Sequence, residues 1–568
     1  MCGIHVVISP HKSDEIPADL RRCLCNRGPD HIATHETRLS DALDDTPTTH
    51  LAFTSTVLAL RGDYLAQQPF VDSASGSVLC WNGEAWKIRH HDVAGNDGEA
   101  VAGLLNEAVA QSSSNREGAI LKVLRSIDGP FAFAFFDKPS KKLYFGRDRL
   151  GRRSLLIRQD MQGLVLSSIA ETVAPEWKEV EADGVYVLNL ASTEVGSNGL
   201  NELNPVPIKL QWLDGEDAEH FVSAIGRFND SMPVEGTISP MARGSVSVKS
   251  LRHHLTESLK LRVLNVPTPP SMSDQQPQWR VAVLFSGGLD CTVLARLCHD
   301  LLPQDQGVDL INVAFENPRV AANAKKSKDQ AMLDSFDIYE VCPDRITGRK
   351  SFAELQAVCP GRTWRFLCVN VPYAEYLGHK SEVTSLIFPH NTEMDLSIAC
   401  ALYFAARGQG SAFADAASDS SVPCTTSARV LLSGLGADEL FGGYVRHATA
   451  FDRRGYSGLI DELKLDVSRL GKRNLGRDDR VMSHWGREVR FPFLDEELVR
   501  WAIGIPVWEK CNFDQADGDV EPGKRVLRLL ALELGMTGVA SEKKRAIQFG
   551  SRTAKMESGR VKGTTLLS

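Results

Sequence analysis

Met1-Cys2-Gly3-Ile4 opens the chain and places a cysteine at its second position. Removal of the methionine, which is usual before a small residue, would leave Cys2 with both a thiol and a free α-amine. An α-amine has a pKa of about 8, so it can act as the base that activates the thiol of the same residue. The sequence therefore predicts an N-terminal nucleophile, provided that no segment precedes Cys2.

The composition is that of an ordinary globular protein. The chain has 568 residues, a length that is enough for two or three domains. Its residues are 43% hydrophobic and 24% charged, which is typical of globular proteins. A net charge of −8 indicates no basic field for nucleic acid, and no apolar run is long enough to span a bilayer. The N-terminus lacks signal-peptide features, and the cysteines form no disulfide or zinc framework. We therefore expect a cytoplasmic protein without nucleic-acid or membrane partners; its oligomeric state is open.

The first half of the chain is rich in short apolar runs separated by turn residues. Alternation and aromatic content, as over 131–136, indicate strands, and residues 98–109 fit a helix. Residues 1–205 are therefore predicted to form an α+β domain made largely of antiparallel sheet. Residues 206–244 carry Pro, Gly and Ser without clear periodicity and are predicted to be a connection.

The second half begins with a different pattern. Apolar residues recur at every fourth position over 251–263, which is typical of an amphipathic helix. Apolar runs at 281–285 and 310–315 then flank a helical stretch. Strand, helix and strand at this spacing predict a parallel sheet, so residues 245–568 are predicted to form an α/β domain. Within it, residues 407–427 are rich in Gly, Ala and Ser and are predicted to be a flexible surface insertion.

Four clusters in the first half can converge on Cys2. They are Asn26-Arg27-Gly28-Pro29-Asp30, Arg61, Asn82-Gly83-Glu84 and Asp97. Thiol attack on an amide builds an oxyanion, which Asn82 and the Gly83 backbone N–H can hold. Arg61 suits the α-carboxylate of a glutamine substrate, and Asp97 suits its α-ammonium group. Simpler interpretations are a hairpin turn at Asn82-Gly83, a helix cap at Asp97 and a surface charge at Arg61.

A second polar group follows the predicted strand at 281–285. Ser286-Gly287-Gly288-Leu289-Asp290 opens a helix, and backbone N–H groups in such a loop form an anion cradle with the helix end. No Gly-Lys-Ser/Thr follows, so this is not a Walker loop. Asp290 ends this loop, and Asp438 lies in a second Gly-rich turn further along the chain. The alternative is a Gly-rich turn without a ligand.

These motifs resemble known families. Met1-Cys2-Gly3-Ile4, Arg27-Gly28-Pro29-Asp30, Asn82-Gly83-Glu84 and the Gly-Arg-Asp-Arg-Leu-Gly run at 146–151 resemble class II glutamine amidotransferases. The loop at 286–290 resembles the pyrophosphate loop of the N-type ATP pyrophosphatases. In this order the motifs resemble glutamine-dependent asparagine synthetase, and the runs at 473–480 and 544–551 are similar to asparagine synthetase domain-containing proteins.

The resemblance implies both a fold and a reaction. The fold is a four-layer N-terminal-nucleophile domain followed by an α/β parallel-sheet domain of the ATP-pyrophosphatase type. The substrates are glutamine, aspartate and ATP, with Mg²⁺. Cys2 forms a γ-glutamyl thioester and releases ammonia, which passes inside the protein to an aspartyl-adenylate and gives asparagine and AMP.

The resemblance also assigns residues to these steps. It implies catalysis by Cys2, Asn82, Gly83 and Lys524; glutamine binding by Arg61, Asn82, Gly83, Glu84 and Asp97; ATP binding by Phe285, Ser286, Gly287, Gly288, Leu289, Asp290, Ala314, Ser433 and Gly434; and metal binding by Asp290 and Asp438. Asp395, in the run 390–395, either lines the acceptor site or caps the helix that follows.

The sequence departs from the family pattern at both sites. Leu435 and Ala437 stand where asparagine synthetases have glutamate and serine, and Cys291 stands where serine is usual. Residues 85–87 read Ala-Trp-Lys in place of Ile-Tyr-Asn. Three hypotheses follow: an asparagine synthetase, an amidotransferase of the same architecture with another carboxylate as acceptor, and a non-catalytic regulator or scaffold.

Overall fold

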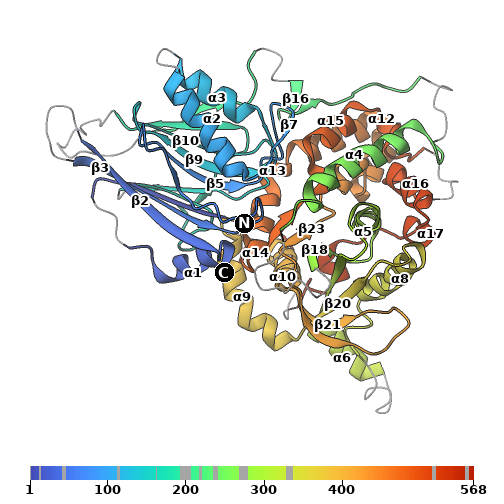
Figure 1. The fold of residues 1–568 in the computed structure, drawn as a ribbon. Coiled ribbons are helices and arrows are strands. Elements are labelled where there is room, and N and C mark those ends of the chain that lie inside the picture. The colour runs from blue at the N-terminus through green and yellow to red at the C-terminus, as the bar shows by residue number, and fades with distance from the viewer. Residues whose placement is uncertain are drawn as a thin grey trace. The chain divides into compact units, whose positions relative to one another are not determined.

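The chain folds into two compact units (Figure 1). Unit 1 comprises Met1–Ala224, Ser385–Pro389 and Arg469–Arg487, and unit 2 comprises the remainder. The computed structural model describes residues 2–11, 15–40, 47–111, 115–161, 163–191, 206–215, 220–234, 241–267, 279–327, 337–514, 520–556 and 562–567.

Unit 1 contains two six-stranded sheets in which all pairings are antiparallel. The first has the order β13-β11-β12-β1-β3-β2, with bounds Lys178–Glu179, Leu156–Asp160, Gly163–Ser167, Gly3–Ser9, Pro47–Val57 and His31–Ser40. The second has the order β15-β14-β10-β9-β5-β4, with bounds Ile208–Gln211, Gly184–Asn189, Lys142–Arg147, Phe131–Asp137, Val78–Gly83 and Phe70–Val71.

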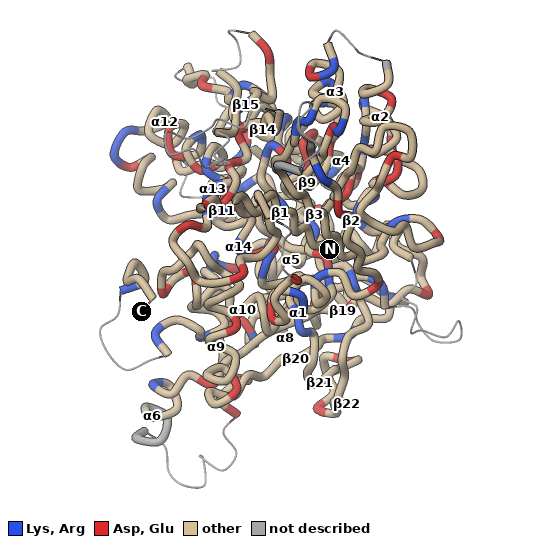
Figure 2. The backbone as a smooth tube through the Cα atoms, turned by 90° about the vertical axis from the view of Figure 1, so that its left-hand side faces the viewer, with Lys and Arg blue, Asp and Glu red and all other residues tan. Residues whose placement is uncertain are grey.

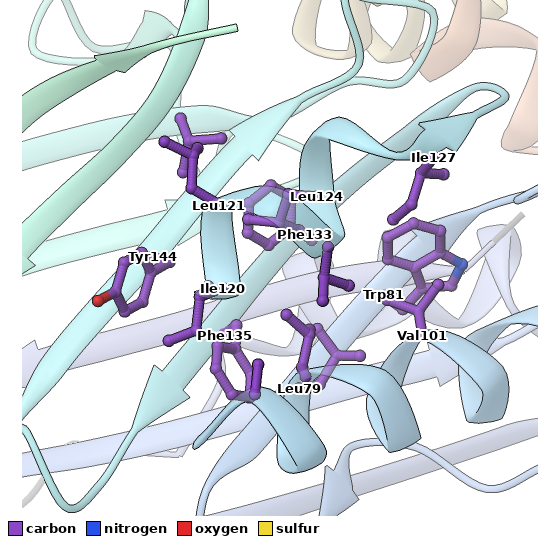
Figure 3. Close-up of a cluster of buried hydrophobic side chains, with 14 of the residues drawn as sticks. Leu79, Trp81, Val101, Ile120, Leu121, Leu124, Ile127, Phe133, Phe135 and Tyr144 are labelled. Carbon is purple, nitrogen blue, oxygen red and sulfur yellow. The ribbon is translucent and has the colours of Figure 1, made fainter. Parts of the chain in front are cut away.

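Strand β9 shows how unit 1 is layered, because both of its faces are buried. Ala132, Ala134 and Phe136 face the first sheet and belong to the core between the sheets. Phe133 and Phe135 face the opposite way, into a cluster with side chains of α2 (Asp97–Gln111) and α3 (Arg116–Arg125) (Figure 3). A strand covered on both faces is apolar throughout, which accounts for the unbroken apolar run.

Further elements complete unit 1. Helix α1 packs against β1 and β3 and ends at Arg27. Helix α14 comes from far along the chain yet belongs to this unit. The remaining bounds are α1 Ala18–Arg27, β6 Lys87–Ile88, β7 His91–Asp92, β8 Ile127–Asp128, α13 Leu470–Arg473 and α14 Leu475–Ser483. Two antiparallel sheets packed face to face, with helices outside, confirm the predicted N-terminal-nucleophile fold.

Unit 2 is built on a seven-stranded sheet with five parallel strands and an antiparallel edge. The order is β22-β21-β20-β19-β18-β23-β24, with bounds Val422–Thr425, Gln409–Phe413, Trp364–Val371, Gly307–Phe315, Trp279–Leu284, Val430–Leu432 and Glu488–Arg490. The predicted strands at 281–285 and 310–315 correspond to β18 and β19, which pair in parallel. The predicted α/β parallel-sheet fold is therefore confirmed.

The larger helices of unit 2 include α4, which the four-residue periodicity predicted. They are α4 Val246–Val263, α5 Leu289–Leu301, α6 Pro318–Ser327, α8 Pro343–Val358, α9 Tyr373–Ile387, α10 Glu393–Arg407, α12 Val445–Ser468, α15 Glu496–Gly504 and α16 Arg525–Glu533, with α9 ending inside a unit 1 segment. The shorter ones are α11 Ala437–Phe441, η2 Pro492–Leu494, η3 Val507–Glu509, α17 Thr537–Ala540 and α18 Ile547–Gly550.

Two interpretations of the sequence need correction. Residues 407–427, predicted to be a flexible insertion, contain β21 and β22, which extend the sheet as an antiparallel hairpin. An edge hairpin is held by backbone hydrogen bonds, so its Gly-, Ala- and Ser-rich composition gave no strand signal. The predicted connection at 206–244 begins inside the sandwich, because β15 pairs with β14. The remaining domain boundaries stay predictions.

Charge is distributed evenly along the described chain. Lys and Arg alternate with Asp and Glu in both units rather than forming a basic stripe (Figure 2). Among the described residues, no helix combines the length and the apolar character needed to cross a membrane.

Candidate active sites

The first candidate site surrounds Cys2, which is buried immediately before β1. The side-chain amide of Gln68 donates to Cys2 Sγ at 3.8 Å, and its carbonyl oxygen accepts from the backbone N–H of Trp81 at 2.9 Å. Gln68 therefore connects the thiol to β5, one residue before Asn82. On the other side, Arg27 Nε donates to the carbonyl oxygen of Cys2 at 3.3 Å. Cys2 is thus held at both its thiol and its backbone.

Asn82 is fully buried in β5, and its amide is unsatisfied. Neither its Nδ2 nor its Oδ1 has a hydrogen-bond partner among the residues that the structure describes. A buried polar group left without a partner costs about 1–3 kcal/mol, so such groups are rare and often mark a ligand position. At Gly83, which follows, a Cβ would lie 2.4 Å from the carbonyl oxygen of Pro130, so only glycine fits.

Asp97 is buried beside this strand end. Its Oδ2 accepts from the indole N–H of Trp81 at 3.0 Å and from the backbone N–H of Ala85 at 2.9 Å. Burial raises the pKa of Asp97 above the ordinary aspartate value, and the charge of Arg61 opposes that rise. The carboxylate is therefore held in place by β5 and the turn after it, within electrostatic reach of a guanidinium group.

Arg61 is also buried, in the segment that follows β3. Its Nη2 donates to the carbonyl oxygen of Val93 at 2.6 Å, and its Nε lies 3.6 Å from Glu84 Oε2. Its guanidinium lies 5.6 Å from the ring centre of Trp86. A fixed cation and a fixed anion around the end of β5 suit the α-carboxylate and α-ammonium groups of an amino acid.

The simpler interpretations of these residues do not hold. Asn82-Gly83 lies within a strand rather than in a hairpin turn. The side chain of Asn96, not that of Asp97, accepts from the backbone N–H of Glu99 in the first turn of α2. Arg61 is buried and is therefore not a surface charge. The structure gathers all of these predicted residues around the end of β5; their roles stay predictions.

The second candidate site lies in unit 2, where β18 runs into α5. Gly287 has a φ of +79°, and a Cβ there would lie 2.5 Å from Gly348, so the turn requires glycine. The loop is closed by Ser286, whose hydroxyl accepts from the backbone N–H of Gly288 at 3.3 Å. The thiol of Cys291 donates to the carbonyl oxygen of Gly288 at 3.3 Å, inside the loop. The loop is therefore a tight glycine turn closed by its own hydrogen bonds, and its role as an anion cradle stays a prediction.

Lys524 joins the two predicted metal carboxylates. Its Nζ donates to both oxygens of Asp290 at 2.8 Å and lies 2.9 Å from Asp438 Oδ1. Lys544 donates to the other oxygen of Asp438 at 2.8 Å. The loop at 286–290 and the second Gly-rich turn also touch, since a Cβ at Gly434 would lie 2.8 Å from Asp290 Cβ. The sequence thus brings Asp290, Asp438 and Lys524 into one cluster.

The charged groups of this cluster shift one another's pKa values. Burial and the neighbouring Asp438 raise the pKa of Asp290, against the effect of Lys524. Burial would also raise the pKa of Asp438, but Lys524 and Lys544 hold it below the ordinary value. Both carboxylates raise the pKa of Lys524 although burial opposes this, so Lys524 stays charged. Two carboxylates that converge on one cation form a donor set suited to a divalent metal ion.

Other predicted residues lie at varying distance from this cluster. Phe285 is buried after β18, and the side chain of Asn312 donates to its carbonyl oxygen at 2.9 Å. Ala314 is buried on β19 and is paired with Asn370 of β20. Ser433 follows β23, and its hydroxyl accepts from the backbone N–H of Leu435 at 3.3 Å. The structure shows no direct role for Ala314 at the loop, so its ATP-binding role stays a prediction.

Asp395 lies in the first turn of α10 rather than before that helix. The hydroxyl of Thr392 accepts from the backbone N–H of Asp395 at 3.1 Å and donates to its carboxylate at 2.5 Å. These contacts form the N-terminal cap of α10. The residue that caps α10 is therefore Thr392, which Asp395 contacts from the first turn, and a role of Asp395 at an acceptor site stays a prediction.

Sequence reasoning missed two residues of these sites. Gln68 is a single polar residue outside any recognised motif, so no pattern identified it as a contact of the Cys2 thiol. Lys544 stood in a run that was noted for its resemblance, but no role followed from that run. The density of basic residues over 543–545 was the only available signal.

Comparison with known proteins identifies both units. Residues 1–198 match the glutamine amidotransferase domain family, and residues 451–564 match the asparagine synthase family. Together with the fold and the two sites, these matches define the class: an asparagine synthetase-like protein with a glutamine amidotransferase domain.

Similar proteins of full length define the family more narrowly. "Asparagine synthetase domain-containing protein 1" is 34% identical in Bos taurus, covering 99% of this chain and 97% of that protein. Its namesake in Homo sapiens is 33% identical, covering 98% and 96%. A "putative asparagine synthetase [glutamine-hydrolyzing] 1" of Methanocaldococcus jannaschii is 39% identical over 22% of this chain and 28% of that protein. The chain belongs to the family of asparagine synthetase domain-containing proteins.

Proposed function

We propose that this protein is a glutamine-dependent amide ligase that hydrolyses glutamine at Cys2 and amidates a carboxylate activated with ATP. Aspartate is the proposed acceptor, and asparagine, AMP and pyrophosphate are the proposed products. The observation that carries the proposal is the cluster in which Lys524 joins Asp290 to Asp438 beside an anion-cradle loop. The asparagine synthase family match supports ATP as the second substrate.

In the first half-reaction, the Cys2 thiol attacks the side-chain amide carbon of glutamine. Negative charge develops on the amide oxygen, where the unsatisfied amide of Asn82 and the Gly83 backbone N–H would stabilise it. The carbon–nitrogen bond breaks and ammonia leaves with a proton transferred from the base. Water then hydrolyses the thioester to give glutamate. Arg61, Glu84 and Asp97 would fix the α-amino and α-carboxyl groups during both steps.

In the second half-reaction, a carboxylate oxygen of the acceptor attacks the α-phosphorus of ATP. The bond to the β-phosphate breaks, and pyrophosphate leaves as the acyl-adenylate forms. Ammonia from the first site then attacks the acyl carbon, and AMP leaves. Lys524, which is buried and charged, would offset negative charge on the phosphates in both steps.

The residues present fit a divalent metal ion. Carboxylate oxygens of Asp290 and Asp438 lie within 2.9 Å of one ammonium nitrogen, so they already converge on a single cationic centre. Mg²⁺ bound by these two aspartates would neutralise phosphate charge during displacement of pyrophosphate.

Leu435 favours a second candidate, a ligase with a different acceptor. It stands where asparagine synthetases carry a glutamate that is associated with forming the adenylate, and it cannot accept a hydrogen bond or balance a charge. A partly exposed leucine beside Ser433 suits a less polar acceptor carboxylate.

A product assay tests the proposal. Purified protein, with removal of Met1 verified by mass spectrometry, is incubated with glutamine, aspartate, ATP and Mg²⁺. Glutamate, asparagine, AMP and pyrophosphate are quantified. A Cys2→Ala variant supplied with ammonium runs in parallel as the control for the second site.

Each outcome decides between the hypotheses. Asparagine and AMP formed in equal amounts, with glutamine dependence lost in Cys2→Ala, support the proposal. Glutamate without AMP favours the other acceptor, to be sought by AMP release with a series of carboxylic acids. No glutamate and no AMP with any of these acids would contradict both ligase functions and leave a regulator or scaffold.

A further inference from the structure

Unit 1 is completed by a segment that lies between Asp438 and Lys524 in the sequence. Residues Arg469–Arg487 belong to unit 1, and every residue of α14 within them is buried. This helix carries Arg477, Asp478, Asp479 and Arg480, although charged residues are almost never fully buried unless they are paired. Each of these buried charges therefore needs a partner inside the protein.

Asp479 is paired with Arg27, which lies 452 positions earlier in the chain. Asp479 Oδ2 accepts from Arg27 Nη2 at 2.9 Å, and neither side chain is exposed to solvent. The same oxygen accepts from the backbone N–H of Ser154 at 3.1 Å. Ser483, one turn further along α14, accepts from Arg27 Nη1 at 2.6 Å and donates to the carbonyl oxygen of Asp479. Both terminal nitrogens of Arg27 are therefore bound by α14.

The third guanidinium nitrogen of Arg27 contacts the backbone of Cys2. Its Nε donates to the carbonyl oxygen of Cys2 at 3.3 Å. The backbone next to Arg27 packs closely on β3, because a Cβ at Gly28 would lie 2.5 Å from the backbone nitrogen of Val57. A continuous set of buried hydrogen bonds thus runs from Asp479 through Arg27 to Cys2.

A second route from α14 reaches the next residues of β1. Arg480 Nη1 donates to the hydroxyl of Ser154 at 2.8 Å, and that hydroxyl donates to the carbonyl oxygen of Ser168 at 2.9 Å. The hydroxyl of Ser168 accepts from the backbone N–H of Ile4 at 3.0 Å. The start of β1 is therefore linked to α14 on two sides.

We propose that Asp479 is a positioning residue for Cys2 and fixes the nucleophile through Arg27. The inference rests on the proposed hydrolysis of glutamine at Cys2. Asp479 touches no reacting atom; it locks the guanidinium that locates the Cys2 backbone. A displacement of about 1 Å at a reacting group can lower a rate on the order of 100-fold, so loss of this anchor acts on kcat more than on glutamine binding.

The test uses the full-length protein with matched variants. Asp479→Asn keeps the shape of the side chain and removes its charge. Asp478→Asn is the control, because Asp478 is equally buried in the same helix but pairs with its neighbour Arg477 at 2.8 Å. Glutamate release gives kcat and KM, the trapping rate of Cys2 by an electrophilic glutamine analogue reports the nucleophile, and thermal unfolding reports the fold.

We expect Asp479→Asn to lower kcat and the trapping rate roughly 10- to 100-fold with KM within about twofold. Asp478→Asn should keep wild-type kcat at a similar loss of thermal stability, and Asp479→Glu should restore part of kcat. Equal kcat in wild type and Asp479→Asn would overturn the inference alone. A wild-type protein that neither releases glutamate nor is trapped would overturn the proposed function and the inference together.

A milder variant tests the inference even if Asp479→Asn does not fold. Ser483→Ala removes one hydrogen bond to Arg27 and leaves the ion pair in place. We expect it to lower kcat about threefold with KM unchanged. If Asp479→Asn does not fold and Ser483→Ala has wild-type kcat, the segment serves folding only and the inference is wrong.

Discussion

The two candidate sites differ in how their polar groups are satisfied before any substrate is present. Around Cys2, the amide of Asn82 is buried without a partner among the described residues. In unit 2, Asp290 and Asp438 are paired with Lys524, and Asp438 is also paired with Lys544. The first site contains an unsatisfied amide that a ligand can satisfy, whereas in the second site the carboxylates are already neutralised by two lysines.

This difference teaches what each site must do when substrate binds. Asn82 gains hydrogen bonds without losing any, so its contribution can go entirely to the transition state. Under the proposed function, the lysines and carboxylates of unit 2 would exchange partners for phosphates and a cation. We therefore expect substitutions in the first site to lower activity with little loss of stability, and those in the second site to lower stability as well.

The largest effect is expected for Lys524→Met. Removal of a buried ammonium leaves Asp290 and Asp438 close together without their shared counter-charge. We expect a loss of about 3–5 kcal/mol in the free energy of unfolding and no AMP formation with ammonium as nitrogen source. Denaturant unfolding and an AMP assay measure the two effects. If Lys524→Met is as stable as the wild type, solvent screens the two carboxylates, and the proposed difference between the two sites does not exist.

Asn82→Ala should act on rate without this loss of stability. We expect kcat for glutamate release to fall on the order of 100- to 1,000-fold, because one oxyanion donor is removed. The free energy of unfolding should change by only about 1 kcal/mol, since the amide has no partner to lose among the described residues. Ammonium-dependent AMP formation is the internal control. A stability loss as large as that of Lys524→Met would refute the view of a prepared, unsatisfied amide.

Lys544→Met should have a smaller effect, because its side chain is partly exposed and pairs with only one carboxylate. We expect KM for ATP to rise about fivefold, which corresponds to a partly screened charge pair of about 1 kcal/mol. Lys543→Met, whose side chain is 83% exposed, is the matched control and should leave KM unchanged. If both variants behave alike, Lys544 is a surface charge and the second site depends on Lys524 alone.

The smallest effect is a pH dependence at the first site. Under the proposed function, binding of the α-ammonium group of glutamine would need the ionised form of Asp97, whose pKa is raised by burial. As pH falls through this raised pKa, the carboxyl is protonated, so KM for glutamine should rise at pH values above the usual aspartate range. Steady-state kinetics from neutral to acidic pH measure this. Asp97→Asn should show a high KM that does not vary with pH; a flat KM in the wild type would contradict the assignment.

The sequence predicted those parts of the sites that lie in local motifs. Asn82, Asp97, Asp290 and Asp438 each stand beside a strand or turn whose pattern is readable over a few residues. That Asn82 is buried without a partner depends on packing from other strands, so only the structure could show it. Gln68 illustrates the limit, because a lone glutamine reaches the Cys2 thiol only after the chain has folded.

The fold was predicted where burial follows a simple period and missed where it does not. Helix α4 shows a regular apolar face, whereas α14 carries four charged residues in nine and resembles a surface helix in sequence. Its partner Arg27 lies 452 positions away, so no local pattern could reveal the pairing. A domain boundary at a single position also cannot describe a unit that takes in Ser385–Pro389 and Arg469–Arg487.

The wide separation between Arg27 and Asp479 has a consequence for how the protein is made. A ribosome adds about 5–20 residues per second, so the 452 positions between the two residues take roughly 20–90 s to synthesise. During that interval the nascent N-terminal unit lacks the helix that binds its buried arginine. Cys2 therefore gains its full set of contacts only after Asp290 and Asp438 have been translated, so the proposed glutaminase site would mature only once most of the proposed synthetase unit exists.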